Sequence, residues 1–336
     1  MCKSLKPSKV VLQAVQDHWA LSGELKFVRK VENWIYYAPQ EKVYIRLTEP
    51  SHRKKSEIES ELDWLKHLEN SGVLFAHPVA AKREEGEKRE IGEKGVKGRK
   101  RADDKPEGLV KRVFDATSEY FVSVFREAEG RPLKSPEDFT NEVFTSWGRS
   151  LGKIHQASKA YVPGANIVKR DEWNTDRNFR EILASMHPSQ GGFYRKANEV
   201  IEMFASFPKS ERDYGLVHAD FHRGNFHVNH RNDVIAFDFD DCHYHWFAYD
   251  VGTVFFSLEK HEYLQPWREA EHHFWMGYDL ENEMDSSWKE RVGIFSDYRV
   301  IVVYFWCLRN LKTPTLNSEA RNWMINKMKW CEHAMA

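Results

Sequence analysis

The segment from residue 217 to residue 225 places a carboxylate and an amide at a fixed spacing in a polar loop that follows a short apolar strand. It reads Val-His-Ala-Asp-Phe-His-Arg-Gly-Asn, so that Asn225 comes five residues after Asp220. The next apolar stretch, residues 234–237, ends in a second carboxylate, Asp238. Phosphoryl transfer requires a carboxylate that orients and deprotonates a hydroxyl, together with hard oxygen ligands for magnesium. The spacing therefore predicts a phosphoryl-transfer site in which Asp220 is the base and Asn225 and Asp238 are metal ligands.

The residues around this loop favour a hairpin that brings the two metal ligands together. Residues 226–228 and 234–237 are short strand signals, and residues 229–233 between them have the composition of a turn. A single Asp or Asn in a loop is most often a turn former or a helix cap. Three oxygen donors at this spacing on a strand–loop–strand frame favour a kinase-type site instead.

The chain resembles the aminoglycoside phosphotransferase and choline kinase superfamily, whose bacterial members carry the pattern H-G-D-x-x-x-x-N. Ala219 stands where that family usually has glycine. The resemblance extends to the segments 44–47, 61–65, 151–155 and 250–252, and it covers roughly residues 24 to 310. The loop and Asp238 are its most specific parts.

The resemblance implies an α+β, bilobal protein-kinase-like fold with a small β-rich N-terminal lobe and a larger, mainly helical C-terminal lobe. We expect the nucleotide-binding lobe to span residues 1–126 and the catalytic and substrate-binding lobe to span residues 127–336. Residues 82–106 carry interspersed charges of both signs and few apolar side chains, which predicts a solvated insertion rather than core. In the first lobe, the pattern Ser56-Glu57-Ile58-Glu59 predicts a capping box that opens a helix ending near residue 70.

The resemblance also implies where the nucleotide would bind. Arg46 falls at the position of a phosphate-gripping lysine and Glu61 at the position of its partner, although Arg46 could instead be a surface cation on an edge strand. Asn33 lies in the turn that covers the phosphates in kinases, and this turn has no glycine, which counts against a protein kinase. Glu127 and Ala128 would form the hinge beside the adenine. The implied cofactors are ATP and Mg²⁺.

The acceptor is expected to be a small polar molecule, either a metabolite or an antibiotic, that carries a hydroxyl and an amine. Asp240, Asp241 and Trp246 are candidates for binding the amine by charge pairing and cation–π contact. Two other interpretations stay open, since Asp240 could help to hold a second metal ion and the aromatic side chains could be core. The sequence identifies neither the acceptor nor a preference between ATP and GTP.

Bulk properties exclude several classes of partner. A net charge of −1 provides no field that would favour nucleic acid or an anionic membrane. The four cysteines lack the spacing of a zinc site or of a disulfide framework, and the first residues lack a signal peptide's apolar core. These features predict a cytoplasmic protein, and they leave the oligomeric state undetermined.

Two other functions remain as alternatives. A protein kinase of the bacterial stress-response type would use the same fold and the same loop. A haloacid-dehalogenase-like phosphatase would use Asp238 of the sequence Asp238-Phe239-Asp240 as its nucleophile, but that mechanism leaves Asp220 and Asn225 without a role.

Overall fold

The computed structural model describes residues 6–82, 108–259, 267–312 and 316–335. The expected charged insertion therefore lies outside the described residues, apart from Lys82. The chain divides into two compact units. The first comprises Met1–His67, Ala76–Ala128 and Val162–Lys169, and the second comprises Leu68–Phe75, Glu129–Tyr161 and Arg170–Ala336.

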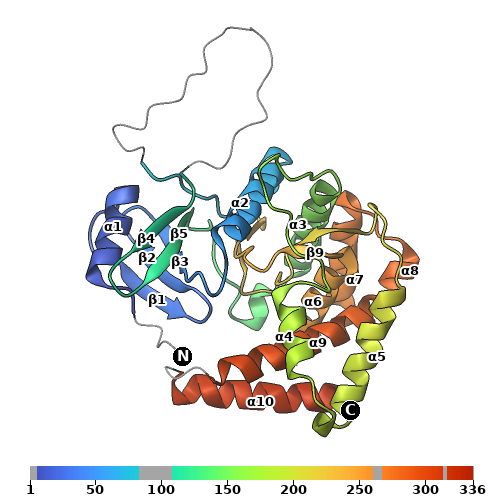
Figure 1. Cartoon of the computed structure of the whole chain (residues 1–336). Helices are drawn as coiled ribbons and strands as arrows, with labels where there is room; N and C mark the ends of the chain where they lie inside the picture. The colour runs from blue at the N-terminus through green and yellow to red at the C-terminus, as the bar shows by residue number, and fades with distance from the viewer. Residues whose placement is uncertain (1–5, 83–107, 260–266, 313–315, 336) are drawn as a thin grey trace. The chain divides into compact units, whose positions relative to one another are not determined.

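A five-stranded antiparallel sheet forms the centre of the first unit, with strand order β1-β2-β3-β5-β4 (Figure 1). Its strands are β1 (Lys26–Lys30), β2 (Trp34–Ala38), β3 (Val43–Thr48), β4 (Lys111–Phe114) and β5 (Glu119–Arg126). Strand β3 is central, and the side chains on both of its faces are buried. Because successive side chains of a strand point to opposite faces, Ile45 and Arg46 lie on different sides of the sheet.

Helix α1 (Lys9–Trp19) joins the apolar core on one face of this sheet. Val11 and Val15 come from the helix, and Ile45 and Val124 are among the buried sheet residues of the same core. The indole N–H of Trp19 donates to the carbonyl oxygen of Val79 at 2.8 Å. This bond satisfies the one polar group that an otherwise apolar helix face carries into the core.

Helix α2 (Lys55–Asn70) begins earlier than the sequence predicted. Ser56 lies inside its first turn, so the expected capping box that starts at Ser56 is wrong. The carboxylate of Glu57 instead accepts the backbone N–H of Lys54 at 2.7 Å. This bond is the reciprocal half of a capping box, because a side chain at the third helical position reaches back to the backbone before the helix.

The second unit is mainly helical. Its helices are α3 (Asn141–Lys159), α4 (Arg177–Ser185), α5 (Gly192–Ser206), α6 (Phe247–Glu259), α7 (Trp267–Glu281), α8 (Ser286–Lys289), α9 (Val292–Asn310) and α10 (Ser318–Ala334). Two small antiparallel pairs accompany them, β6 (Tyr214–Val217) with β9 (His243–Trp246) and β7 (Phe226–Val228) with β8 (Val234–Ala236).

Two glycines allow helices α3 and α7 to approach closely. A Cβ atom on Gly148 would lie 1.9 Å from the carbonyl oxygen of Phe274, and one on Gly277 would lie 1.8 Å from that of Thr145. Any larger residue would force the two backbones apart, so this contact explains the glycines. The packing fixes α3, whose C-terminal half carries His155.

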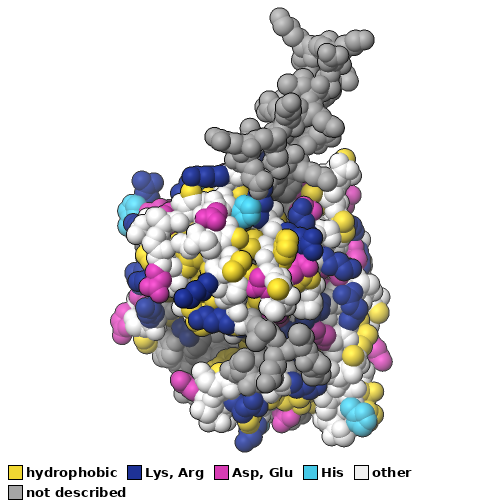
Figure 2. Space-filling model, turned by 60° about the vertical axis from the view of Figure 1, so that its left-hand side comes forward, with side chains coloured by type: hydrophobic (Ala, Val, Ile, Leu, Met, Phe, Trp, Pro, Cys, Tyr) yellow, Lys and Arg dark blue, Asp and Glu magenta, His cyan; other side chains and the backbone are white. Residues whose placement is uncertain are grey.

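The antiparallel sheet of the first unit and the helices of the second confirm the predicted α+β class. Among the described residues, no helix is both long and apolar enough to cross a membrane. On the face shown in Figure 2, basic and acidic side chains are interspersed, as the near-zero net charge would suggest.

Candidate functional site

The catalytic-loop candidate lies in the second unit, between strands β6 and β7. Strand β6 ends at Val217 and β7 begins at Phe226. Phe226 pairs with Ala236 across the β7–β8 hairpin, and the backbone N–H of Phe237 donates to the carbonyl oxygen of Asn225 at 2.9 Å. This confirms the predicted hairpin and places Asn225 and Asp238 at the same end of it.

Asp250, in the first turn of α6, holds the start of the loop. Its two carboxylate oxygens accept the backbone N–H groups of His218 and Ala219, each at 2.7 Å. His155 of α3 contacts the same carboxylate through Nε2 at 3.1 Å, and both side chains are fully buried. Burial raises the pKa of the Asp250 carboxyl group, but the hydrogen bonds from His155 and from the loop N–H groups outweigh burial and leave this pKa below its usual value.

The backbone of Ala219 adopts the left-handed region, with φ of 66°. This conformation explains why glycine is usual at the corresponding position of the resembled family, since only glycine adopts it without steric cost. The N–H of Ala219 is bound by Asp250, and its carbonyl oxygen accepts from Nη1 of Arg299 at 3.1 Å. Both peptide groups that flank this strained residue are therefore fixed by side chains.

The carboxylate of Asp220 is surrounded by cationic and amide groups. Oδ2 accepts from Nδ2 of Asn225 at 2.8 Å and lies 3.4 Å from Nε2 of His222, whereas Oδ1 pairs with Nη2 of Arg299. Burial raises the pKa of this carboxyl group, but the charges of His222 and Arg299 outweigh burial and bring the pKa well below its usual value. Asp220 is therefore ionised at neutral pH and can accept a hydrogen bond from a hydroxyl.

The amide of Asn225 is oriented by Asp220. Its Nδ2 donates both to the carbonyl oxygen of Asp220, at 2.9 Å, and to Oδ2 of the same residue, at 2.8 Å. Since both donors of an amide sit on its nitrogen, this arrangement turns the oxygen Oδ1 away from Asp220. An amide oxygen is a hard ligand of the kind that magnesium binds.

Asp238 follows strand β8 and has a left-handed backbone, with φ of 68°. The imidazole of His218 contacts the carbonyl oxygen of the preceding residue, Phe237, through Nε2 at 3.2 Å. His218 is fully buried and thus links the start of the loop to the peptide before Asp238. A carboxylate and an amide oxygen at one end of a hairpin are a donor set that fits a hard divalent cation.

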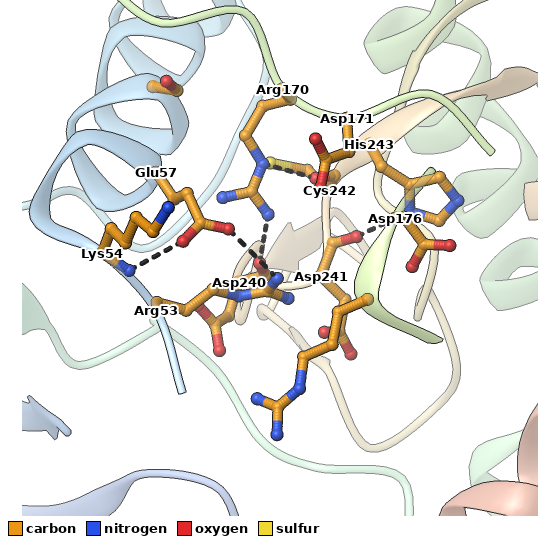
Figure 3. A network of polar contacts seen from close by, with 12 residues as sticks. Arg53, Lys54, Glu57, Arg170, Asp171, Asp176, Asp240, Asp241, Cys242 and His243 are labelled. Carbon is orange, nitrogen blue, oxygen red and sulfur yellow. Dashed lines mark hydrogen bonds and ion pairs between the residues drawn. The ribbon is translucent and has the colours of Figure 1, made fainter. Parts of the chain in front are cut away.

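The segment after Asp238 is held by Arg170 (Figure 3). Its guanidinium donates through Nε to the carbonyl oxygen of Cys242 at 2.7 Å and through Nη2 to that of Asp240 at 2.6 Å. The imidazole Nδ1 of His243 contacts the carbonyl oxygen of Asp241 at 2.9 Å. These bonds hold the backbone of the segment that carries the carboxylates of Asp240 and Asp241.

Trp246 does not have the expected place beside a ligand. Its side chain is fully buried, and its indole N–H donates to the carbonyl oxygen of Pro208 at 2.8 Å. Its ring lies among those of Trp173, Phe204 and Phe295. The structure therefore corrects the prediction that Trp246 contacts an amine, because both its ring and its polar group are used by the core.

The candidate nucleotide residues lie in the first unit. Arg46 and Glu61 form a buried bidentate pair, with Nη1–Oε1 at 2.9 Å and Nη2–Oε2 at 2.7 Å, and the two side chains are 5% and 1% exposed. The guanidinium carbon also lies 5.0 Å from the ring centre of Phe125. Arg46 is thus not a surface cation on an edge strand, since β3 is central and its side chain is buried.

The other nucleotide candidates are also placed within this unit. Asn33, in the β1–β2 turn, is 9% exposed. The carboxylate of Glu127 accepts from the hydroxyl of Tyr37 at 2.9 Å, and the backbone N–H of Glu127 donates to the carbonyl oxygen of Lys42 at 2.8 Å. Ala128 is buried. The N–H of Glu127 is therefore already used, and a nucleotide base could not accept from it in this conformation.

Sequence reasoning missed two side chains around the loop. It matched the segment that contains His155 but did not pair that imidazole with Asp250, and it passed over Arg299. The available signal for Arg299 was a single cation in an apolar stretch of helix, between Tyr298 and Val300. A buried cation in such a stretch indicates a charged partner from elsewhere in the chain.

Comparison with known proteins identifies the class. The model of the phosphotransferase enzyme family matches residues 30–282, which is most of the chain. The chain therefore belongs to this family, and the prediction that it is a phosphotransferase is confirmed. A haloacid-dehalogenase-like phosphatase is set aside, because the chain belongs to the phosphotransferase enzyme family.

Individual relatives are kinases of small molecules. Amicoumacin kinase of Bacillus subtilis (strain 168) is 25% identical over an alignment of 314 residues that covers 90% of this chain and 85% of that protein. A solved amicoumacin kinase in complex with AMP-PNP, Ca²⁺ and Ami has a TM-score of 0.80 and 24% identity, covering 98% of this chain and 94% of the other. A microcompartment-associated aminopropanol kinase has a TM-score of 0.72 and 20% identity, with coverages of 97% and 95%. These likenesses confirm the predicted kinase-like fold.

Proposed function

We propose that this protein transfers the γ-phosphate of ATP to a hydroxyl group of a small, polar, amine-bearing molecule, with Mg²⁺ as the divalent cation. The orientation of Asn225 by Asp220 is the observation that carries this proposal. The carboxylate and the carbonyl oxygen of Asp220 fix the amide nitrogen, so that the amide oxygen is directed away from Asp220 and would be available to a metal ion. The bond to the carbonyl oxygen of Asp220 would stabilise a turn as well, whereas the bond to its carboxylate joins the two side chains that the proposal assigns to catalysis and metal binding.

Asp220 acts as the catalytic base. An ionised carboxylate has about four lone-pair sites, and its described partners are Arg299 on Oδ1 and Asn225 and His222 on Oδ2. A lone-pair site on Oδ1 therefore remains available to accept a hydrogen bond from the hydroxyl of the acceptor. Accepting this hydrogen bond orients the hydroxyl oxygen toward the phosphorus and takes up the proton as the bond to phosphorus forms.

Asn225 and Asp238 would hold the magnesium ion through Oδ1 and a carboxylate oxygen. When bound, the ion supplies charge neutralisation on the phosphate oxygens. The chain contributes the orientation of both ligands, through the hydrogen bonds of Asn225 to Asp220 and of His218 to the peptide before Asp238. The solved amicoumacin kinase holds AMP-PNP and Ca²⁺, which supports a nucleotide together with a divalent cation in this family.

The first lobe, residues 1–126, would bind the nucleotide and the second, residues 127–336, would carry out catalysis. Arg46 would position the phosphates while Glu61 fixes its guanidinium, and Asn33 would lie over the phosphates. Glu127 and Ala128 would contact the base through backbone groups other than the N–H of Glu127. The buried bidentate pair supports this role for Arg46, since it holds a planar cation in one orientation.

Asp240 and Asp241 would bind the amine of the acceptor. Alternatively, Asp240 would help to hold a second metal ion. Support comes from the rigid backbone that Arg170 gives this segment. It also comes from the relative that acts on aminopropanol, an amino alcohol. Because the fold alone does not determine the substrate, the acceptor must be identified by experiment.

A panel of amino alcohols, aminosugars and amine-bearing antibiotics, incubated with the purified protein, ATP and Mg²⁺, tests the proposal. We expect acceptor-dependent ADP release, with a phosphate ester detected on the acceptor by phosphorus NMR. Asp238→Ala should abolish this turnover and the Mg²⁺ dependence of ATP binding. Transfer to protein acceptors alone, or unchanged Mg²⁺-dependent ATP affinity in Asp238→Ala, would contradict the proposal.

A further inference from the structure

A single arginine interrupts the apolar face that helix α9 packs into the second unit. Arg299 is flanked by Tyr298 and Val300, which are 2% and 5% exposed, and its own side chain is only 12% exposed. Removing a guanidinium from water is strongly unfavourable unless it is paired and hydrogen-bonded. A cation at this position therefore requires a partner whose interaction offsets the cost of burying the charge.

The partner is the catalytic loop, which Arg299 contacts at two adjacent residues. Nη1 donates to the carbonyl oxygen of Ala219 at 3.1 Å, and Nη2 pairs with Oδ1 of Asp220. The buried Tyr249, on α6, also interacts with the guanidinium. The contact thus joins a backbone group and a side-chain group of the loop through one planar fork.

We propose that Arg299 is a positioning residue that fixes the rotamer of Asp220, so that its remaining lone pairs are directed toward the hydroxyl of the acceptor. This inference rests on the proposed function, because it assigns Arg299 a task only if Asp220 is the base. Arg299 acts through Asp220 and the carbonyl oxygen of Ala219.

Two contacts on opposite sides define the rotamer of Asp220. Asn225, at the end of the loop, donates to Oδ2 at 2.8 Å, and Arg299, on α9, donates to Oδ1. With only one of these partners the carboxylate could rotate about its Cβ–Cγ bond, and a misplacement of about 1 Å can cost on the order of 10²-fold in rate. Asn225 and, at 3.4 Å, His222 both contact Oδ2, so Arg299 provides the contact that fixes Oδ1.

The geometry requires arginine rather than a generic cation. The two parallel N–H groups of a guanidinium reach Ala219 and Asp220 at once, whereas the ammonium of lysine is a point charge on a flexible stem. Arg299→Lys keeps the positive charge but loses the fork, and Arg299→Gln loses the charge as well. Comparison of the two variants therefore distinguishes the effect of the fork geometry of Arg299 from the effect of its positive charge.

A double-mutant cycle with Asp220→Ala tests the proposal. In the otherwise wild-type protein, we expect Arg299→Lys and Arg299→Gln to lower kcat by roughly 10- to 100-fold while the affinity for Mg²⁺–ATP changes by less than about twofold. In the Asp220→Ala background, where no carboxylate remains to be positioned, the same substitutions should lower the residual rate by less than about threefold.

The matched control is Arg309→Gln on the same helix, which removes an ion pair to Glu181 of α4 without touching the loop. It should leave kcat unchanged. Melting temperatures of all variants identify any that fail to fold, and Arg299→Lys, which keeps the buried charge paired, decides the question if Arg299→Gln does not fold.

Two results would overturn this inference. One is a normal kcat in Arg299→Lys and Arg299→Gln, and the other is an equal fold-loss in the presence and absence of the Asp220 carboxylate, which would indicate a general structural role. Either result leaves the proposed function intact if Asp220→Ala itself is slow. Failure of the proposed function appears separately, as a wild-type protein without acceptor-dependent turnover or as normal turnover by Asp220→Ala.

Discussion

The carboxylate of Asp250 accepts the backbone N–H of His218 at 2.7 Å, and through this bond helix α6 holds the first residue of the catalytic loop. The other oxygen of the same carboxylate binds the N–H of Ala219, and His155 of α3 contacts the oxygen that accepts from His218. Because all of these groups are buried, the loop conformation depends on the packing of two helices rather than on a bound substrate.

Asp250→Asn should therefore destabilise the second unit. The amide would present N–H donors to a site where three donors already converge, which leaves at least one buried donor without an acceptor. We expect a loss of about 2–5 kcal/mol in the free energy of unfolding, measured by urea denaturation. Asp285→Asn is the control, because asparagine caps a helix as well as aspartate does and Asp285 is the N-cap of α8. Equal stability of Asp250→Asn and wild type would refute the anchoring role.

The Arg46–Glu61 pair predicts that Arg46→Lys is not a conservative substitution. A lysine cannot form the two parallel bonds of 2.9 and 2.7 Å, so the buried carboxylate of Glu61 would lose one of them. We expect a loss of about 1–3 kcal/mol in stability and a weaker affinity for ATP, measured by thermal denaturation and calorimetric titration. The exposed pair Arg112–Glu119 of the same sheet provides the control Arg112→Lys, which should change neither quantity measurably. ATP affinity that stays unchanged in a folded Arg46→Lys protein would argue against the phosphate-positioning role.

Buried histidines predict a loss of stability in mild acid. Burial lowers the pKa of His155 and brings that of His245 well below its usual value, with further lowering by His243 in the case of His245. The unfolded chain binds protons at these residues as the pH falls through about 6.5, whereas the folded chain does not. Stability present above this pH is therefore lost below it, by up to about 1.4 kcal/mol per pH unit for each histidine.

His245→Phe isolates one of these contributions. The Nε2 atom of His245 has no hydrogen-bond partner in the described part of the chain, and the ring stacks on Tyr249. Its Nδ1 atom accepts the backbone N–H of Trp246 at 2.9 Å, so His245→Phe loses this bond at every pH while it removes the titrating group. Denaturation between pH 5 and 7 should show a shallower slope in this variant. The exposed residue His230 supplies the control, since His230→Gln should keep the wild-type slope. A slope that His245→Phe does not alter would contradict the assignment.

The sequence was sufficient to predict the parts of the fold and site that depend on local order. The apolar strands on either side of the turn at residues 229–233 predicted the hairpin that brings Asn225 and Asp238 to one end. The resemblance placed a strand at residues 44–47, where the structure has β3 (Val43–Thr48), and this strand places Arg46 and Ile45 on opposite faces of the sheet.

Two of the features that sequence reasoning missed depend on contacts between distant segments. Arg299 meets Asp220 across 79 positions of the chain, and no local pattern specifies that pairing. Trp246 was expected at a ligand because aspartates precede it, but tertiary packing decided its burial beside Phe204 and Phe295. The start of α2 was misplaced for a different reason, since Glu57 caps the backbone of Lys54 and Ser56 is not the first residue of the motif.

The turnover and ATP affinity of Asp220→Asn test the central claim most directly. Asparagine keeps the size of the side chain but removes the charge that accepts the proton of the hydroxyl. With an acceptor identified from the panel, we predict a fall in kcat of roughly 10²–10⁴-fold, while the affinity for Mg²⁺–ATP stays close to that of wild type. A folded Asp220→Asn protein with normal turnover would contradict the assignment of this loop as the site of phosphoryl transfer.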